Sequence, residues 1–246
     1  MNNQSDQLDF SVIIPALNEQ NRIGPVVHQF HVLDGQYSYE VIVGDGGSTD
    51  RTAEIASEQG ATVVIDHSER KTVAGGRNAG ANIARGGTLI FCDADTRLSN
   101  VSHLAESIEL LFRDPTVVAA VPRMEVFPEQ RLLRDRIFHS CFNALIRTSF
   151  YLPVPFSRGQ CQIIRANAFH KVGGYNAAQI HADDNTIFQH LAKIGKLKFI
   201  NDITVYESPR RYRKYGYLQL SFLCVYSIWG QAIFKRNILK RWDRVD

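Results

Sequence analysis

Short apolar runs alternate with amphipathic stretches through the first half of the chain. Runs rich in β-branched residues predict strands at residues 10–14, 40–43, 61–65, 86–92 and 117–121. Apolar residues at helical spacing predict helices at about residues 20–33, 53–59 and 77–84. Strands that alternate with helices indicate βαβ units, in which helices cover both faces of the sheet. We therefore predict an α/β fold with a mostly parallel sheet.

The second half of the chain is less regular. The pattern predicts a helix at 131–151, a strand at 160–165, a helix at 181–194 and one or two short strands at 198–206. The proline-rich LPVPF at 152–156 connects the first two of these elements. Because no linker interrupts the pattern, we expect one domain over residues 1–206, with a front half at 1–122 and a back half at 123–206.

Composition is ordinary for a water-soluble protein, with 44% hydrophobic and 22% charged residues. The first ten residues, MNNQSDQLDF, lack the apolar core of a signal peptide. The four cysteines, Cys92, Cys141, Cys161 and Cys224, form no CxxC pair, which fits a reducing compartment and argues against a structural zinc site. We therefore expect a cytoplasmic location.

The net charge of +3 is unevenly distributed. From residue 204 to the end, nine Lys and Arg stand against three Asp and Glu, a local charge of +6; the preceding residues have nineteen against twenty-two, a local charge of −3. A basic tail on a slightly acidic body indicates an anionic partner. Charge alone leaves phosphate, a membrane surface and nucleic acid open.

Polar clusters follow three of the predicted strands: PALNE at 15–19, DGGSTD at 45–50 and DAD at 93–95. In open parallel sheets, ligands bind at the carboxyl ends of the strands. On an extended backbone, Asp93 and Asp95 would point to the same side and repel each other unless a cation lies beside them. A solvated turn is the alternative for each cluster, but three clusters at one edge favour a binding site.

Six motifs appear in a fixed order: PALNE, VIVGDGGSTDRT, GGRNAG, FCDADT, IIRANAFHKVGGYN and HADDNTIFQHLAKIG. Together they resemble glycosyltransferase family 2 over residues 10–206. The resemblance implies a GT-A fold, with nucleotide-sugar binding in residues 1–122 and acceptor binding and catalysis in 123–206. It also implies transfer of a sugar from a nucleotide-diphosphate donor to an acceptor hydroxyl, in most members with inversion.

By this resemblance, Asp93 and Asp95 are the DxD pair that binds a divalent metal and, with Ala94 between them, the nucleotide-sugar. The chemistry agrees, because carboxylates and a diphosphate are hard oxygen anions that can meet only around a hard cation such as Mg²⁺ or Mn²⁺. We assign Asp95 as the metal ligand. Asp93 is assigned as its partner, toward the ribose or a metal-bound water.

The resemblance further implies that the nucleotide is contacted by Pro15, Ala16, Glu19, Asp45, Arg77 and Asn78. Asp45 is expected at the nucleobase, where the two glycines after it allow the backbone to approach a ligand closely. The residue before Arg77 is Gly76, where the family often has alanine. A surface ion pair at the start of a helix is the alternative role for Arg77.

An inverting transfer needs a base that takes the proton of the acceptor hydroxyl. By position in HADDN we assign Asp184 as this base and Asp183 as its neighbour, toward the acceptor or the sugar. The family usually has Glu-Asp at these two positions, so the shorter Asp183 leaves the reverse assignment open. Acidic residues that merely stabilise a helix N-terminus are the alternative.

The segment SPRRYRKYG at 208–216 is similar to a basic, aromatic segment of some bacterial family members. Its arginines, Arg211 among them, could close over the pyrophosphate, because a guanidinium presents a planar fork of donors. A solvated basic loop is the alternative. The interleaved tyrosines superficially resemble a nucleic-acid surface, but nothing else in the chain supports that partner.

Residues 217–234 are apolar nearly all round if they are helical, and the basic KRNILKRWDR follows them. We expect residues 207–246 to form a basic loop and a C-terminal helix that packs on the protein or on a dimer partner. Peripheral contact with the inner face of a membrane, with a lipid-linked acceptor, is the second option.

Three other activities compete with an inverting transfer: a retaining glycosyltransferase, a nucleotidyltransferase and an inactive nucleotide-sugar-binding protein. A nucleotidyltransferase would be expected to carry a glycine-rich basic loop after the first strand, where this chain has PALNEQNRIG. Retention of Asp93, Asp95 and Asp184 together argues against an inactive protein. No GxGxxG follows the first strand, which excludes a nicotinamide dehydrogenase. UDP-, GDP- and dTDP-sugars are all consistent with these motifs.

Overall fold

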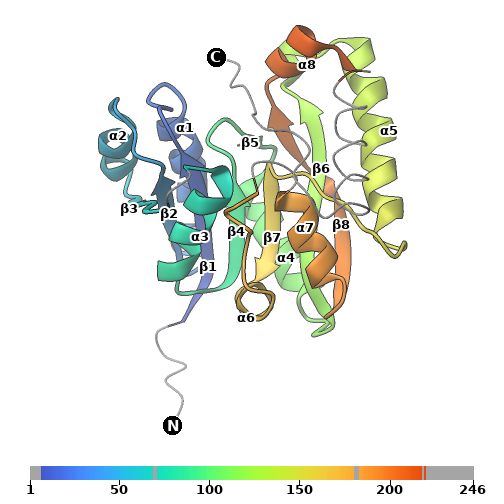
Figure 1. The fold of residues 1–246 in the computed structure, drawn as a ribbon, viewed down its shortest axis with the longest axis horizontal. Coiled ribbons are helices and arrows are strands. Elements are labelled where there is room, and N and C mark those ends of the chain that lie inside the picture. Colours follow the sequence, from blue (N-terminus) through green and yellow to red (C-terminus); the bar gives the residue numbers. More distant parts are fainter. Residues whose placement is uncertain (1–6, 69–70, 180–182, 218, 220–246) are drawn as a thin grey trace.

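An eight-stranded sheet forms the centre of the protein, with strand order β3-β2-β1-β4-β7-β6-β8-β5 (Figure 1). The computed structural model describes residues 7–68, 71–179, 183–217 and 219. The strands are β1 (Leu8–Ala16), β2 (Tyr39–Asp45), β3 (Thr62–Ile65), β4 (Gly86–Cys92), β5 (Arg97–Leu98), β6 (Val117–Val126), β7 (Cys161–Arg165) and β8 (Lys196–Glu207). The five strands predicted in the first half of the chain are confirmed as β1 to β4 and β6, and β6 is longer than predicted.

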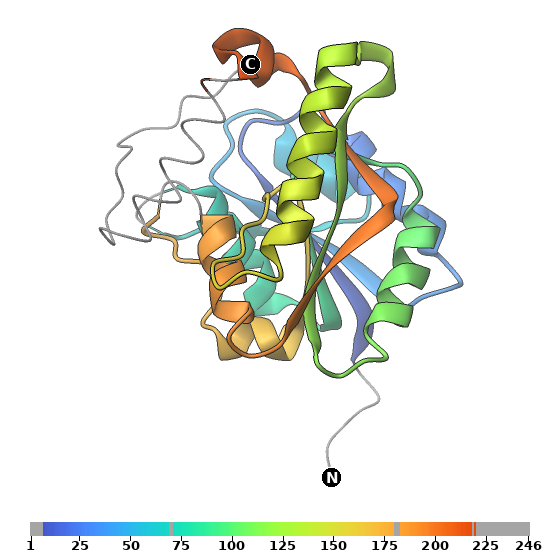
Figure 2. The ribbon, with the colours of Figure 1, turned by 90° about the vertical axis from the view of Figure 1, so that its right-hand side faces the viewer.

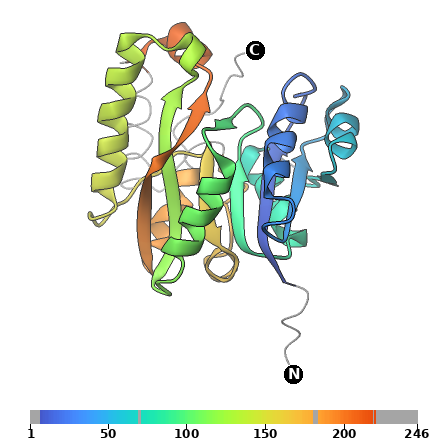
Figure 3. The ribbon, with the colours of Figure 1, turned by 180° about the vertical axis from the view of Figure 1, so that it is seen from behind.

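Helices cover both faces of this sheet, as predicted. They are α1 (Ile23–His28), η2 (Gln29–Leu33), α2 (Thr52–Glu58), α3 (Val73–Ile83), α4 (Val101–Leu111), η3 (Pro128–Gln130), α5 (Leu133–Ser149), α6 (Ala166–Lys171), α7 (Asp183–Leu191) and α8 (Arg210–Tyr215). Helices α3, α6 and α7 lie on the face toward the viewer in Figure 1, whereas α1 and α4 lie on the opposite face, seen in Figure 3. The helix expected over residues 20–33 is divided into α1 and the 3₁₀ helix η2.

The sheet is mixed rather than uniformly parallel. Strands β1 to β4 pair in parallel, as do β6 and β8, but β7 lies antiparallel between β4 and β6. Two reversals restore the direction, so β6 and β8 run the same way as β4. The start of β7 and the ends of β2, β4 and β8 therefore meet at one edge of the sheet. The predicted boundary at residues 122 and 123 falls inside β6, and the division into two halves stays a prediction.

Both faces of the central strands are buried. Along β1, Val12 and Ile14 pack into the core under α1 and α4, while Ile13 packs into the core under α3. In β4, Ile90 and Phe91 divide in the same way between the two cores. This double burial explains why these strands read as continuous apolar runs rather than as alternating patterns.

The apolar segment predicted to form a C-terminal helix, residues 217–234, lies outside the described residues except for Tyr217 and Gln219. In the described part of the chain, no helix combines the length and the apolar character that a membrane span requires.

Candidate active site

The loops after β1 and β2 are fastened to each other at the carboxyl edge of the sheet. Asp45, only 2% exposed, accepts hydrogen bonds from the amide (3.1 Å) and the hydroxyl (2.5 Å) of Ser48. Asn18 has a positive φ of 54° and accepts from the amide of Thr49 at 2.8 Å, and the amide of Glu19 donates to Thr52 at 2.7 Å. These hydrogen bonds hold the loop after β1 against the loop after β2, where the nucleobase is predicted to bind.

Three further residues at the end of β1 and in the loop after it, Pro15, Ala16 and Glu19, are predicted to contact the nucleotide, and their side chains differ in their surroundings. Ala16 is the last residue of β1 and is buried, and Pro15 lies against α3, where it limits the space beside Gly76. The carboxylate of Glu19 accepts a hydrogen bond from Arg22 at 2.7 Å. Contacts of these residues with a nucleotide stay predictions.

Asp93 and Asp95 lie in a tight turn after β4, not on the extended backbone that we expected. The amide and the hydroxyl of Thr96 both donate to the carbonyl of Asp93, at 3.2 Å and 2.8 Å, and close this turn. The side chain of Ala94 packs into the core, while those of Asp93 and Asp95 remain partly exposed. The turn thus presents two carboxylates at the edge with a buried methyl group between them.

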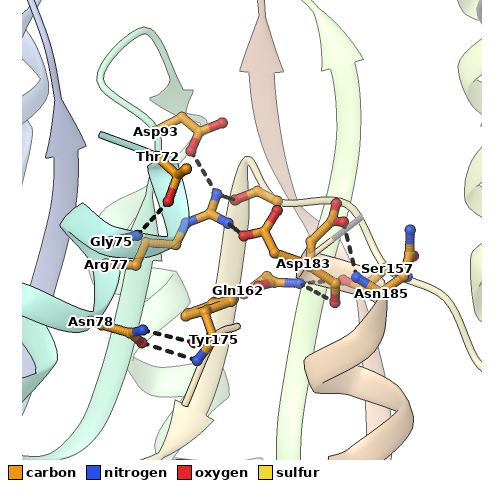
Figure 4. Close-up of polar contacts among 12 residues, drawn as sticks. Thr72, Gly75, Arg77, Asn78, Asp93, Ser157, Gln162, Tyr175, Asp183 and Asn185 are labelled. Carbon is orange, nitrogen blue, oxygen red and sulfur yellow. Dashed lines mark hydrogen bonds and ion pairs between the residues drawn. The ribbon is translucent and has the colours of Figure 1, made fainter. Parts of the chain in front are cut away.

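Arg77 lies at the centre of the site, almost fully buried (Figure 4). Its guanidinium donates to Asp93 at 2.9 Å, to Asp183 at 3.2 Å and to the carbonyl of Gly159 at 2.7 Å, and it lies 5.1 Å from the ring centre of Tyr175. The surface ion pair considered as an alternative is therefore wrong, because this ion pair is interior. Arg77 links the turn after β4 to the start of α7.

Close packing of α3 on β2 places Arg77 at this position. A Cβ on Gly76 would lie 2.8 Å from the carbonyl oxygen of Gly44, and a Cβ on Gly44 would overlap the carbonyl of Gly76. Glycine at both positions lets the two backbones approach, and the hydroxyl of Thr72 accepts from the amide of Gly75 at 3.0 Å to begin the helix. The close contact with Gly44 thus explains why this chain has glycine at position 76, where the family often has alanine.

Burial and the neighbouring charges shift the titration of this group of residues. Burial raises the pKa of Asp93 to about 6 despite the lowering effect of Arg77, and Asp95 adds to the rise. Burial alone would lower the pKa of Arg77, but Asp93 and the other nearby acidic groups raise it above its usual value. Arg77 therefore keeps its charge, and it compensates two carboxylates at once.

Asp95 faces a different set of charges. Burial and then the charge of Glu207 raise its pKa, while Arg210, Arg22 and Arg211 lower it. The carboxylate is 38% exposed, and the guanidinium of Arg210 lies 3.8 Å away. Two hard carboxylates in this turn suit a cation such as Mg²⁺ or Mn²⁺. Within the described ranges, no three His, Cys, Asp or Glu side chains are grouped as a metal site, so further ligands would have to come from a bound substrate.

The two aspartates at the start of α7 have different surroundings. Asp183 is paired with Arg77, whereas Asp184 forms no ion pair among the residues that the structure describes. Burial, and then the adjacent Asp183, raise the pKa of Asp184 to about 7. Its carboxylate accepts from the amide of Asn185 at 2.9 Å. Asp184 is thus suited to exchange a proton near neutral pH, as a general base must.

The side chain of Asn78 points away from the turn that holds Asp93 and Asp95 (Figure 4). Its side-chain amide donates to the carbonyl of Tyr175 at 2.7 Å and its oxygen accepts from the amide of Tyr175 at 3.0 Å (Figure 4). Gly173 and Gly174 before Tyr175 have φ of 83° and 71°, so the GGY sequence forms a turn. Asn78 holds this turn against α3, and a nucleotide contact by Asn78 stays a prediction.

A second layer of polar residues supports the start of α7, and sequence reasoning did not identify it. The hydroxyl of Tyr175 donates to Gln162 at 2.6 Å, and the amide of Gln162 donates to Ser157 (2.9 Å) and to the carbonyl of Asp184 (3.3 Å). Asn185 accepts from the amide of Ser157 at 2.9 Å. A glutamine within the apolar strand CQIIR was the available signal, since a buried amide needs partners.

Glu207, at the end of β8, holds α8 at the edge of the site. It accepts from Arg158 at 2.6 Å, from the hydroxyl of Tyr212 at 2.7 Å and from Gln160 at 2.9 Å. This network was also missed, because Glu207 and Arg158 are far apart in the sequence. It fixes the start of the basic segment, including Arg210, next to Asp95.

These features define a GT-A-type α/β protein with an acidic edge. Two solved structures share the fold. The mannosyltransferase PcManGT from Pyrobaculum calidifontis, in complex with GDP-Man and Mn²⁺, superposes with a TM-score of 0.64 at 21% identity over 90% of this chain and 65% of its own. Glucosyl-3-phosphoglycerate synthase from Mycobacterium tuberculosis, in complex with Mn²⁺, UDP and phosphoglyceric acid, gives 0.65 at 18% identity over 91% and 79%.

The chain belongs to glycosyltransferase family 2, because the family model described as Glycosyl transferase family 2 matches residues 11–173. A curated relative, 4,4'-diaponeurosporenoate glycosyltransferase from Staphylococcus aureus, is 44% identical over 63 residues. That match spans 25% of this chain and only 16% of the relative.

Proposed function

We propose that the protein transfers a sugar from a nucleotide-diphosphate donor to an acceptor hydroxyl with inversion. In this reaction Asp184 takes the hydroxyl proton, the acceptor oxygen forms a bond to the anomeric carbon, and the bond from that carbon to the diphosphate breaks. The observation that carries the proposal is the division between Asp183 and Asp184: the first is neutralised by Arg77, and the second has a pKa of about 7. A group of this kind is half ionised near neutral pH.

The donor is proposed to bind along the carboxyl edge, with its base beside Asp45 and its diphosphate beside Asp95. Pro15, Ala16 and Glu19 line the base side in this proposal, and the fastened loops after β1 and β2 support it. UDP-, GDP- and dTDP-sugars are the candidate donors. The two similar structures bind a GDP-sugar and UDP, respectively, which supports a nucleotide donor without choosing its base.

Asp95, with Asp93 and Ala94 in the same turn, is proposed to hold a Mg²⁺ or Mn²⁺ ion together with the donor. The metal would neutralise charge on the departing nucleoside diphosphate. Asp93 is already bound by Arg77, so Asp95 is the better ligand of the two. Both similar structures contain Mn²⁺, which supports the choice of metal.

Arg211 and its neighbours on α8 are proposed to contact the diphosphate. The pairing of Arg210 with Asp95 at 3.8 Å supports this, since the helix already lies beside the carboxylate that would face the phosphates. A guanidinium can bind two phosphate oxygens at once.

A binding and turnover screen with the full chain tests the proposal. UDP-, GDP- and dTDP-sugars are titrated with and without Mn²⁺, using wild type, Asp95→Asn, Asp184→Asn and the surface control Glu109→Gln. We expect one donor class to bind more tightly with Mn²⁺ in all variants except Asp95→Asn, and sugar release to be lost in Asp184→Asn although it still binds. Donor binding that ignores Mn²⁺, or full turnover by Asp184→Asn, would refute the mechanism, and the anomeric configuration of the product, read by NMR, distinguishes inversion from retention.

A further inference from the structure

Helix α5 buries an unusual number of polar side chains. Its buried positions are mostly polar: Asp135, His139, Asn143 and Ser149 are buried alongside Ile146. These polar groups are used internally, since Asn143 exchanges two hydrogen bonds with the backbone of Met124 at 3.1 Å and 2.8 Å. Phe142 and Phe150 of α5 also pack against the core, yet other large apolar side chains remain on the outward side of the helix.

The outward face of α5 carries large apolar side chains. Leu133 is 71% exposed, Ile137 58% and Leu145 51%, and the face continues into Tyr151 and Leu152 after the helix, at 85% and 56%. Single exposed apolar residues are common on proteins, but a series along one helix face marks a surface that contacts something else. Figure 2 shows α5 on the outside of the sheet, facing the viewer along its whole length.

Arginines lie at one side of this apolar stripe and within it. At about 100° per residue, Leu133, Ile137 and Leu145 span an arc of about 120°, with Arg136 and Arg147 at one side of it and Arg134 within it beside Leu145. All six side chains belong to exposed residues. The only acidic residue between 131 and 152 is Asp135, which is fully buried. Exposed apolar side chains accompanied by cations and by no exposed carboxylate are the pattern of a helix that lies in the surface of an anionic membrane.

We propose that α5 binds a membrane with an anionic surface, lying flat so that Leu133, Ile137 and Leu145 enter the boundary between headgroups and acyl chains. The 17-residue helix would contribute about 25 Å of contact length. Its guanidiniums would bind lipid phosphates. This inference rests on the burial and charge of α5 and does not depend on the reaction proposed above.

Membrane contact through α5 would also orient the acidic edge. The first turn of α5 is joined to α8, because Arg213 lies 3.8 Å from Asp135 and the ring of Tyr217 lies 4.8 Å from that of Phe138. Figure 2 shows α8 at the same end of the molecule as the start of α5. The site beside Asp95 and Arg210 would therefore be held near the lipid surface.

A second copy of the chain fits this face less well. Two α5 helices packed along their apolar stripes would bring Arg134, Arg136 and Arg147 of one copy close to those of the other. The described face offers no exposed carboxylate to compensate these charges. Anionic phosphates supply that compensation, which is why a lipid surface is the better partner.

Cys141 provides a direct test, since it is exposed on α5 whereas Cys92 and Cys161 are buried. An environment-sensitive fluorophore is attached to Cys141 in a Cys224→Ser background, and vesicles of phosphatidylcholine with or without phosphatidylglycerol are added. We expect a blue shift only with phosphatidylglycerol, weakened by high salt. The matched control carries the fluorophore at Ser57→Cys on α2 in a background with Cys141→Ser and Cys224→Ser, and it should not shift.

Ile137→Gln with Leu145→Gln should weaken vesicle binding about tenfold while the unfolding transition stays in place, because both side chains are exposed. Vesicle binding without a shift at Cys141 would overturn the proposal, since another surface would then be responsible. A shift that appears without vesicles and grows with protein concentration would also overturn it, in favour of a second copy.

Discussion

Asp93, after β4, and Asp183, at the start of α7, accept hydrogen bonds from the same guanidinium, that of Arg77. One residue comes from the part of the chain that we assign to the donor, and the other from the part assigned to the acceptor. The buried cation between them keeps two carboxylates close together at the edge of the sheet. It also leaves Asp184, the neighbour of Asp183, as the carboxylate available for a proton.

Arg77→Met should destabilise the protein by about 3–5 kcal/mol, because Asp93 and Asp183 would lose their shared partner in a buried place. Arg77→Lys should be intermediate, since an ammonium keeps the charge but cannot reach both carboxylates with the same planar fork. Urea unfolding measures both variants. The control is Arg51→Met, whose exposed pair with Glu54 is screened by water and should contribute little. Equal, small losses for Arg77→Met and Arg51→Met would contradict the linking role of Arg77.

The rate of sugar transfer should fall as the pH drops below about 7. The base must be ionised to accept a proton, and burial with Asp183 raises the pKa of Asp184 to about 7. Below that value, log(kcat/KM) should decrease by about one per pH unit. A pH profile from 5 to 9 with saturating Mn²⁺ measures this dependence.

The variant Asp183→Asn tests whether Asp184 is the group that sets this pH dependence. The charge of Asp183 raises the pKa of Asp184, and Arg77, which lowers it, would lose a competing partner. Both effects act in the same direction, so the acid limb of the profile should move to lower pH in Asp183→Asn. A limb that stays in place would mean that another group controls the rate, and a shift to higher pH would contradict the charge arrangement.

The alternation of strands and helices in the first half of the chain was sufficient to predict β1 to β4 and the edge at which their ends meet. Helix α4 was missed although its signals were present: Asn100 accepts from the amide of His103, and apolar residues follow at helical spacing. The antiparallel insertion of β7 could not be predicted, because strand pairing depends on contacts between distant segments. The different surroundings of Asp183 and Asp184 could not be predicted either, because they depend on Arg77, which is distant in the sequence.

The structure predicts that His139 makes stability depend on pH. Burial and the charge of Arg158 lower the pKa of His139 from 6.5 to about 3. Between these values the unfolded chain binds a proton that the folded protein does not, so the free energy of unfolding should rise with pH from about 3 to 6.5. The contribution is about 1.4 kcal/mol per pH unit over that window, and it is lost as the pH falls.

His139→Gln should remove this dependence. The difference in unfolding free energy between wild type and His139→Gln, from urea titrations at pH 4, 5 and 6, should therefore grow with pH in favour of the wild type. The control His103→Gln changes an exposed histidine whose pKa is raised by Glu106 and Asp202, so its contribution is lost only as the pH rises above 6.5. The difference for that variant should therefore stay nearly constant from pH 4 to 6. A pH-independent difference for His139→Gln would show that His139 is protonated in the folded protein.

Gly44→Ala should be among the most damaging small substitutions in the front half of the chain. The added Cβ would overlap the backbone carbonyl of Gly76, which cannot move without displacing α3 and the attached Arg77. We expect a loss of more than about 3 kcal/mol of stability. Gly76→Ala should cost less than Gly44→Ala, because its Cβ would lie 2.8 Å from the carbonyl oxygen of Gly44, a smaller overlap, although the backbone must still shift. Gly87→Ala is the matched control, since its Cβ would come closest to the flexible side chain of Gln7, at 3.2 Å, and would lie an ordinary 3.8 Å from the carbonyl oxygen of Leu8. Thermal unfolding orders the three variants, and a Gly44→Ala protein as stable as Gly87→Ala would mean that α3 does not hold Arg77 through this contact.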